Sequence, residues 1–319
     1  MKLMHLQLLC DPETREDLTL VDPVYDGDEI ISGVLASTTN RYRIIRGIPR
    51  FVTDEGYSDN FGYQWNRWAR VQFEDRNLGG PMEGHTTRMF ETITGFSAGT
   101  LRGKTILDLG CGPGRFTDVA GRMGAGVVAL DYSSAIDAAQ ANFAGKAVDI
   151  LFVQGDALRA PLKDSSVDFS FTIGVLHHTP SPLEGVREAH RVTRKGGQFA
   201  IRVYSAGGFY TYPSVQFWRG VFMRFKPLFG HYPPLLYSYL FGSLGYALGK
   251  IWRPLSYPLR MLFPIALLPD YRWTILDTFD AIATTHQSGH TPEEIESWLR
   301  EAGFSEVMQR EGNDWVARK

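Results

Sequence analysis

Three glycines at alternate positions, Gly110, Gly112 and Gly114, follow a short apolar run and precede a predicted helix. A glycine-rich turn between a strand and a helix lets the backbone approach a ligand closely, because no side chain obstructs it. No Lys-Ser or Lys-Thr pair follows at the distance that a phosphate-binding loop requires. Arg115 occupies the place where a dinucleotide-binding loop has its third glycine. The spacing therefore indicates a nucleotide-like ligand and departs from both of these loop types.

Two acidic residues follow the glycine turn at the ends of the next two predicted strands. Asp131 lies about 20 residues after the turn, where a carboxylate can accept hydrogen bonds from both hydroxyls of a ribose. Asp156 follows the third strand, where a side-chain acceptor can bind the exocyclic amine of adenine. Each acid taken singly is equally well explained as a turn or cap residue. Together with the glycine turn, at three successive strand ends, they favour one adenosine-binding site.

Short apolar runs predict the sheet that must position these residues. They cover 105–107, 126–130, 149–153, 167–171 and 198–201, and they alternate with segments that can form helices. Strand, helix and strand at this spacing indicate right-handed βαβ units and hence a parallel sheet. Two further strands, at about 304–310 and 314–317, predict an antiparallel hairpin.

Capping signals mark two of the predicted helices. Ser181, Pro182 and Glu184 predict a helix that begins with a capping box and precedes the fifth strand. Thr291 and Glu294 predict a second capping box, at the start of the helix that precedes the hairpin.

The chain resembles class I S-adenosylmethionine (SAM)-dependent methyltransferases of the type 11 kind, through residues 106–116, 129–131, 155–157 and 174–179. The resemblance implies an α/β fold with a Rossmann-like, seven-stranded, mostly parallel sheet that ends in the antiparallel hairpin. It also implies SAM as the cofactor and S-adenosyl-L-homocysteine as the product. The glycine turn is expected near the methionine part of SAM, Asp131 near the ribose, and Asp156 near the adenine. The expected cofactor-binding residues are Asp108, Gly110, Cys111, Gly112, Gly114, Asp131, Tyr132, Asp156, Ala157 and Gly174.

Histidines near the expected methyl donor are candidates for the catalytic base. Methyl transfer from a sulfonium is an in-line displacement, so most of its catalysis is alignment of the acceptor. A hydroxyl acceptor also benefits from a general base. His178, just past the fourth strand, is the first candidate, with packing and capping as its alternative role. His286 and His290 are weaker catalytic candidates, and His231 and Tyr210 are weaker still.

Residues outside the glycine turn also show a family pattern. The chain resembles a subgroup that carries a Phe-Gly-x-x-Trp segment, here at 61–65, and a later Asp-Thr-Phe-Asp segment, here at 277–280. Gln64, Trp65 and Arg88 are therefore candidates to fold over SAM, whereas Asp277 is equally well explained as the cap of a turn. No spacing of His, Cys and acidic residues predicts a metal in the core.

Changes in residue composition and pattern along the chain predict three parts. Residues 1–55 form a small β-rich module, 56–100 a helical lid or linker, and 101–319 the methyltransferase domain with a helical insertion at 206–290 after the fifth strand. The module resembles the zinc-ribbon activator domain of tRNA methyltransferases, through residues 9–12 and 42–49. A structural zinc site has four ligands, but only Cys10 is present, so we expect a zinc-free module that serves packing or dimer contacts.

The insertion carries an uncharged run, 235–249, that is followed by Lys250, Arg253 and Arg260. The run is shorter than the roughly 20 residues that cross a bilayer. Three interpretations remain open: a lid over an apolar acceptor, a homodimer interface, and a peripheral membrane contact through 235–260.

Composition limits the class of protein and of partner. The 319 residues are 44% hydrophobic and 21% charged, which is typical of a globular protein. A net charge of -2 provides no positive field for a phosphate backbone, so nucleic acid is disfavoured as a partner. The two cysteines, Cys10 and Cys111, lie far apart, and the first residues lack a signal-peptide core. We therefore expect a cytoplasmic protein, with contact to a membrane surface as the open alternative.

These observations favour an O-directed methyltransferase that acts on a small, partly apolar molecule, such as a natural-product or lipid-linked glycan intermediate. Transfer to carbon or nitrogen is an open alternative. Methylation of RNA or protein is one alternative, supported by the zinc-ribbon-like module and opposed by the acidic charge balance. A SAM-binding scaffold without catalytic activity is the other.

Overall fold

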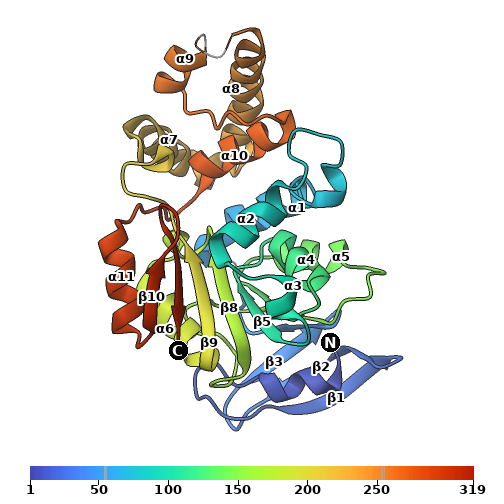
Figure 1. The fold of residues 1–319 in the computed structure, drawn as a ribbon. Coiled ribbons are helices and arrows are strands. Elements are labelled where there is room, and N and C mark those ends of the chain that lie inside the picture. The colour runs from blue at the N-terminus through green and yellow to red at the C-terminus, as the bar shows by residue number, and fades with distance from the viewer. Residues whose placement is uncertain (54–55, 253, 255) are drawn as a thin grey trace.

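The computed structural model describes residues 1–53, 56–252, 254 and 256–319, with the side chain of Tyr57 left undescribed. Arg253, one of the cations noted in the insertion, lies outside the described residues. One continuous sheet runs through the described part of the chain, in the order β1-β2-β3-β4-β7-β6-β5-β8-β9-β11-β10 (Figure 1). Its strands are β1 (Thr19–Asp26), β2 (Glu29–Ala36), β3 (Arg41–Ile45), β4 (Ile48–Arg50), β5 (Thr105–Leu109), β6 (Gly126–Asp131), β7 (Ile150–Gln154), β8 (Val167–Ile173), β9 (Thr193–Arg202), β10 (Ser305–Gln309) and β11 (Asp314–Arg318).

The centre of the sheet is parallel, as the alternating apolar runs predict. Strand β5 pairs in parallel with β6 and β8, β6 with β7, and β8 with β9. Ile106 of β5 belongs to one buried cluster and Leu107 to another, because helices cover both faces of the sheet (Figure 1). The predicted hairpin is confirmed, since β10 and β11 are antiparallel and β11 pairs antiparallel with β9. The predicted fold class is therefore correct.

The strand count differs from the prediction because the N-terminal module is part of the same sheet. Strands β1 to β4 pair antiparallel with one another, and β4 joins β7 in parallel through Arg50 opposite Gln154. The expected seven strands are present from β7 to β10, and the module extends them to an eleven-stranded sheet. The module thus covers the β7 edge, which would otherwise expose unpaired backbone groups.

The helices around the sheet have the following bounds, with short 3-10 turns labelled η. They are η1 (Leu3–Leu8), η2 (Gly56–Ser58), α1 (Asp59–Arg67), η3 (Glu74–Arg76), α2 (His85–Thr94), α3 (Ala98–Leu101), α4 (Arg115–Arg122), α5 (Ala135–Asn142), η4 (Leu176–His178), α6 (Pro182–Val192), η5 (Phe209–Thr211), α7 (Pro213–Phe229), α8 (Tyr232–Ile251), α9 (Ser256–Leu262), α10 (Tyr271–Ala283) and α11 (Pro292–Glu301).

One predicted capping box forms and the other does not. Before α11, the Thr291 hydroxyl accepts from the Glu294 amide while the Glu294 carboxylate accepts from the Thr291 amide, as predicted. Before α6, Ser181 is the N-cap residue and Pro182 begins the helix, but the Ser181 side chain makes no capping hydrogen bond. The predicted box is wrong because the Glu184 carboxylate pairs instead with Arg187, one turn further along the helix.

The insertion consists of helices stacked above the carboxyl ends of the parallel strands. Helix α10 packs against both α7 and α8, and α8 also contacts α9. Figure 1 shows α8 and α9 at the end of the molecule that lies farthest from β1 to β3. None of the helices in the described residues is long and apolar enough to cross a membrane.

A buried carboxylate organises the N-terminal module. Asp11 accepts hydrogen bonds from the Ser37 hydroxyl (2.6 Å), the Asn40 amide (3.0 Å), the Tyr42 hydroxyl (3.0 Å) and the backbone amides of residues 13 and 14. Burial opposes the charge, but these hydrogen bonds outweigh it and lower the pKa of Asp11 to about 2. Asp11 thus joins the first turn to residues 37–40.

We predict that Asp11→Asn lowers the free energy of unfolding by about 1–3 kcal/mol near pH 7, because the amide cannot accept all of these hydrogen bonds. Since the native pKa of about 2 is below the unfolded value of about 3.9, the stabilisation exists above pH 4 and disappears as the pH falls through 2. Urea unfolding at pH 7 and pH 3 measures both effects. The exposed Asp17→Asn is the control, with an expected change below about 0.5 kcal/mol. Equal stability of the two variants at pH 7 would contradict the prediction.

Candidate functional site

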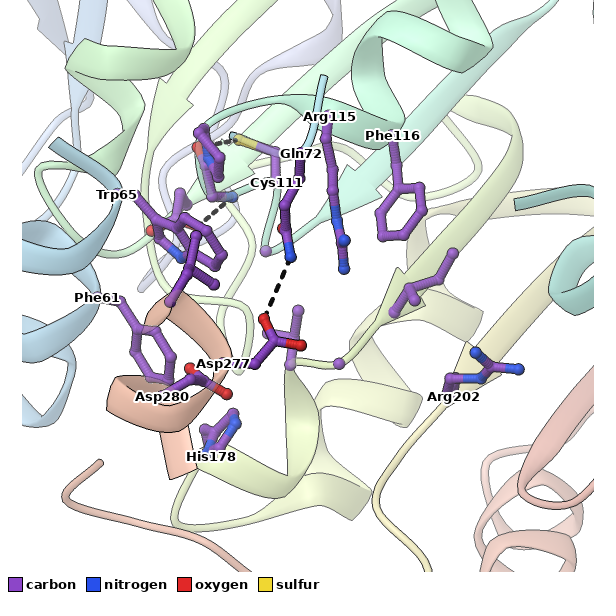
Figure 2. Close-up of a pocket in the computed structure, with 18 of the residues that line it drawn as sticks. Phe61, Trp65, Gln72, Cys111, Arg115, Phe116, His178, Arg202, Asp277 and Asp280 are labelled. Carbon is purple, nitrogen blue, oxygen red and sulfur yellow. Dashed lines mark hydrogen bonds between the residues drawn. The ribbon is translucent and has the colours of Figure 1, made fainter. Parts of the chain in front are cut away.

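A cavity of about 370 Å³ lies where the carboxyl ends of β5, β6 and β8 face the helical insertion. This is the edge at which parallel α/β sheets bind their ligands. The glycine turn and the strand ends form one side, and residues of α1 and α10 form the other (Figure 2). The predicted site residues that line the cavity are Gly110, Cys111, Gly112, Asp131, Tyr132, Ala157, Gly174 and His178.

The glycine turn is held against the end of β6 by its own backbone. The amides of Gly110 and Cys111 both donate to the Leu130 carbonyl, at 2.8 and 2.9 Å. Gly110 has a φ of +89°, and a Cβ atom there would lie 2.4 Å from the Val175 side chain. At Gly112 a Cβ would lie 3.2 Å from Nε1 of Trp65 on α1. The turn therefore requires glycine both for its conformation and for the close approach of its neighbours.

The Asp131 carboxylate is held in place by hydrogen bonds and can still accept one from a ligand. Its carboxylate accepts from the Gly112 amide at 2.8 Å and from the amide and hydroxyl of Ser133 at 2.9 and 2.7 Å. A carboxylate has about four acceptor positions, so one remains for a ligand hydroxyl. Burial raises the pKa of Asp131, and these three hydrogen bonds oppose that effect. The residues present thus fit an adenosine whose ribose lies against Asp131.

Five of the predicted site residues lie outside the cavity lining. Asp108 is buried beneath the turn, where it accepts from the Thr117 hydroxyl at 2.6 Å. Gly114 packs against Phe143, and an Asp156 oxygen accepts from the Leu158 amide at 2.9 Å. His286 has an exposed side chain, and the His290 ring contacts Ser288, Glu294 and Trp298. Their roles in binding or catalysis stay predictions.

His178 has its ring orientation and tautomer set by one hydrogen bond. Nδ1 lies 2.8 Å from the His286 carbonyl oxygen, which can only accept, so Nδ1 carries the proton and Nε2 carries a lone pair. Burial lowers the pKa of His178, although the charge of Asp280 opposes the shift. The ring contacts Phe61 of α1, with centroids 4.9 Å apart. A neutral imidazole in the cavity lining is suited to accept a proton.

Helix α10 places two carboxylates in the cavity, at a spacing of one turn. Asp280 accepts from Gln64 Nε2 at 3.1 Å and from the Tyr204 hydroxyl at 3.0 Å. Asp277 lies 3.4 Å from Gln72 Nε2 (Figure 2). Burial and then the charge of Asp280 raise the pKa of Asp277 to about 7, and the charge of Arg115 opposes the shift. Asp277 therefore lines the cavity and does not cap a turn.

Arg115 faces the same space from the glycine turn. It begins α4, and Figure 2 shows its side chain extending into the cavity between Gln72 and Phe116. Its guanidinium carbon lies 4.4 Å from the centre of the Phe116 ring. Among the described residues, no carboxylate lies within 4 Å of this guanidinium. The cavity thus contains a fixed cation whose charge is available to a ligand.

The glycine turn is predictable from the sequence, whereas the side of the cavity formed by Arg115 and α10 is not. Arg115 was noted only as a departure from a glycine pattern, and Tyr204, Gln72 and Trp273 gave no signal at all. Trp65 does line the cavity and Gln64 binds Asp280, whereas Arg88 donates to the Glu83 carbonyl and does not line the cavity. The recoverable signal was the spacing of Asp277 and Asp280, which places both on one face of a helix.

Comparisons with known proteins agree with the family that the glycine turn indicates. Residues 107–201 match the methyltransferase domain family, which confirms the resemblance to class I SAM-dependent methyltransferases and implies SAM as the cofactor. A demethylmenaquinone methyltransferase of Paenarthrobacter aurescens is 30% identical over 123 residues, which is 39% of this chain and 45% of that protein. An uncharacterized methyltransferase of Mycobacterium bovis is 34% identical over 96 residues, 30% of this chain and 37% of that protein. The chain thus spans less than half the length of these relatives.

Solved structures give a more distant likeness. A putative SAM-dependent methyltransferase of Methanococcus maripaludis covers 84% of this chain and 95% of its own, with 16% identity and a TM-score of 0.44. The complex of the Haloferax volcanii Trm112 methyltransferase activator with a putative methyltransferase covers 78% of each chain, with 18% identity and a TM-score of 0.44. Neither identifies an acceptor for this chain.

We predict that the raised pKa of Asp277 makes the free protein lose stability as the pH rises. The native pKa of about 7 exceeds the unfolded value of about 3.9, so the folded state binds the extra proton and its advantage disappears as the pH passes 7. Between pH 5 and 8 the natural protein should lose about 2–3 kcal/mol relative to Asp277→Asn. Urea unfolding at both pH values measures this, with the exposed Asp164→Asn as control. A constant difference between natural protein and Asp277→Asn would contradict the assignment.

Proposed function

We propose that this chain, whose residues 107–201 match the methyltransferase domain family, transfers the methyl group of SAM to a small, partly apolar acceptor. The observation that carries the proposal is that the glycine turn and Asp131 line the same cavity as His178 and the α10 carboxylates. Donor and acceptor bound there would be adjacent, and alignment is the main requirement of a methyl transfer.

The donor side of the cavity would hold SAM through named groups. The glycine turn would pass beneath its methionine part, Asp131 would accept from its ribose, and Ala157 would lie beside its adenine. Arg115 is placed to pair with the carboxylate of the methionine part, because its guanidinium has no carboxylate within 4 Å in the described residues. When bound, SAM supplies an electrophilic methyl group on a sulfonium.

The acceptor side supports a small molecule. Phe61, Trp65, Met89, Trp273 and Leu276 provide an apolar part of the lining, as in many small-molecule sites. The covering helices α1 and α10 leave a cavity suited to a ligand of limited size. The Paenarthrobacter relative is by name a demethylmenaquinone methyltransferase, which also favours a small-molecule acceptor. The net charge of -2 argues against RNA.

His178 would remove the proton from a hydroxyl acceptor, with its Nε2 as the accepting atom. The His286 carbonyl holds the ring in the required tautomer, and burial lowers the pKa so that the imidazole is neutral near pH 7. This geometry favours O-methylation, because a hydroxyl gains most from a base in the transition state.

We expect Asp131→Asn and Arg115→Met to weaken SAM binding in different ways. Asp131→Asn should weaken both SAM and 5′-methylthioadenosine, which keeps the ribose and lacks the amino-acid part. Arg115→Met should weaken SAM by about 10- to 100-fold, the effect of one charge-assisted hydrogen bond, and leave methylthioadenosine within about twofold. Isothermal calorimetry measures all of these dissociation constants.

Asp164→Asn, an exposed carboxylate away from the cavity, is the matched control and should bind both compounds normally. Failure of the natural protein to bind SAM would overturn the proposed function. Equal losses for both compounds in Arg115→Met would overturn only the role of Arg115.

A second experiment addresses transfer. With methyl-labelled SAM and lipid and aqueous cell extracts as acceptor pools, the natural protein should label a small molecule. His178→Gln should lower that labelling by about 10²- to 10⁴-fold with SAM affinity unchanged, because only the proton acceptor is lost. Unchanged labelling would show that alignment alone carries the reaction. SAM binding without labelling of any pool would favour a scaffold.

A further inference from the structure

The outer face of α8 is an apolar stripe that no part of the described chain covers. Leu236, Leu240, Leu244 and Ile251 lie on one side of the helix, and Leu236 and Ile251 are 70% and 75% exposed. The opposite side is already used for packing, because Gly242 lies against Ile275 of α10. The outer stripe therefore contributes nothing to the core of the insertion.

The exposed apolar surface continues past the end of α8 into α9. We call it the α8–α9 surface, and it consists of Leu236, Leu240, Leu244, Ile251, Trp252, Tyr257, Met261 and Leu262, all of them exposed. The two helices contact each other, and Figure 1 shows them together at one end of the molecule. Monomeric proteins rarely expose apolar patches of this kind, except where another molecule binds.

Exposed apolar side chains are concentrated in the insertion. Of the 24 large hydrophobic residues that are exposed in the described chain, 15 lie between residues 212 and 262. No residue of α8 or α9 lines the cavity, so this surface does not cover the acceptor. The interpretation of the insertion as a lid over the cavity therefore applies to α10. It does not explain the α8–α9 surface.

The charges of the insertion indicate the chemistry of a molecule that would bind the α8–α9 surface. Between residues 206 and 269 the sequence has six Lys and Arg residues and no Asp or Glu. Arg224 and Lys250 are exposed, and neither has a carboxylate within salt-bridge distance in the described residues. Lys226 is paired with Asp59, from outside the insertion. An apolar surface on a segment that carries cations and no acidic residues complements a surface of anionic lipids.

Two other occupants fit less well. A second copy of this chain in a symmetric dimer would bring the same cations together with no acidic residue to offset them. A helix that crosses the bilayer is absent from the described residues. Trp252 and Tyr257, by contrast, are residue types that favour the boundary between lipid headgroups and acyl chains.

We propose that the α8–α9 surface docks the protein on an anionic membrane, with α8 lying in the interface. This goes beyond the proposed methyl transfer and does not depend on it, since docking requires neither SAM nor acceptor. The docked orientation places α10, which packs beneath α8, between the membrane and the cavity.

Co-sedimentation of the full chain with vesicles tests the proposal. Vesicles of phosphatidylcholine with phosphatidylglycerol should bind the protein, and pure phosphatidylcholine vesicles should bind it at least about tenfold more weakly. Leu236→Glu and Lys250→Glu should each weaken binding to the anionic vesicles by at least about tenfold, and higher salt should weaken the natural protein. Leu78→Glu is the matched control, because Leu78 is also 70% exposed but lies outside the insertion.

Natural protein that stays in the supernatant with anionic vesicles would overturn the proposal, as would equal binding of Leu236→Glu and the natural protein. Sedimentation velocity without vesicles identifies the competing outcome. A dimer that Leu236→Glu converts to a monomer, with no vesicle binding by either, would assign the surface to self-association. The SAM dissociation constant and the urea midpoint of each variant show that it is folded, because these side chains lie on the outside.

Discussion

One carboxylate joins the three segments that enclose the cavity. Asp280 on α10 accepts from Gln64 of α1 and from Tyr204, which follows β9. These donors come from α1, which lies between β4 and β5 in the chain, and from the residues just after β9, so a single carboxylate fixes both the insertion and α1 over the strand ends. A partly buried carboxylate that loses such partners is costly, which makes this arrangement of α1, α10 and the end of β9 a unit. The position of Asp277, one turn away, follows from the same constraint.

The donor side of the site was predictable because its signals are local. The sequence places Gly110, Gly112 and Asp131 at the ends of strands that are adjacent in a parallel sheet. In the structure all three line the cavity. The capping box of Thr291 is equally local and formed as predicted. The box at Ser181 failed because Glu184 has a competing partner, Arg187, at helical spacing. Local patterns are reliable where no neighbour offers a better interaction.

The remaining features depend on contacts between distant segments. The module joins the sheet through a single pair, Arg50 opposite Gln154, which leaves no periodic trace in the sequence. In the sequence, Arg115 stands out only because it occupies the position of the third glycine of a dinucleotide-binding loop. The carboxylates that act on its charge belong to α10, more than a hundred residues away in the chain. Asp277 and Asp280 are three residues apart, which suits one face of a helix, but this spacing does not show what such a face would contact. The sequence therefore predicts the glycine-turn side of the cavity more fully than the side formed by α10.

The insertion combines two surfaces that have opposite requirements. The lower side of α10 must carry charge into an enclosed cavity, and Gln64, Gln72 and Tyr204 supply the polar contacts that make this tolerable. The outer side of α8 must remain apolar in water, which is tolerable only because its inner face packs firmly on α10. The same helix pair thus separates the polar interior from the exposed apolar surface. Residues 206–269 lack acids, whereas Asp277 and Asp280 of α10 line the cavity, so the carboxylates lie on the cavity side of the insertion and the proposed lipid-facing side has none.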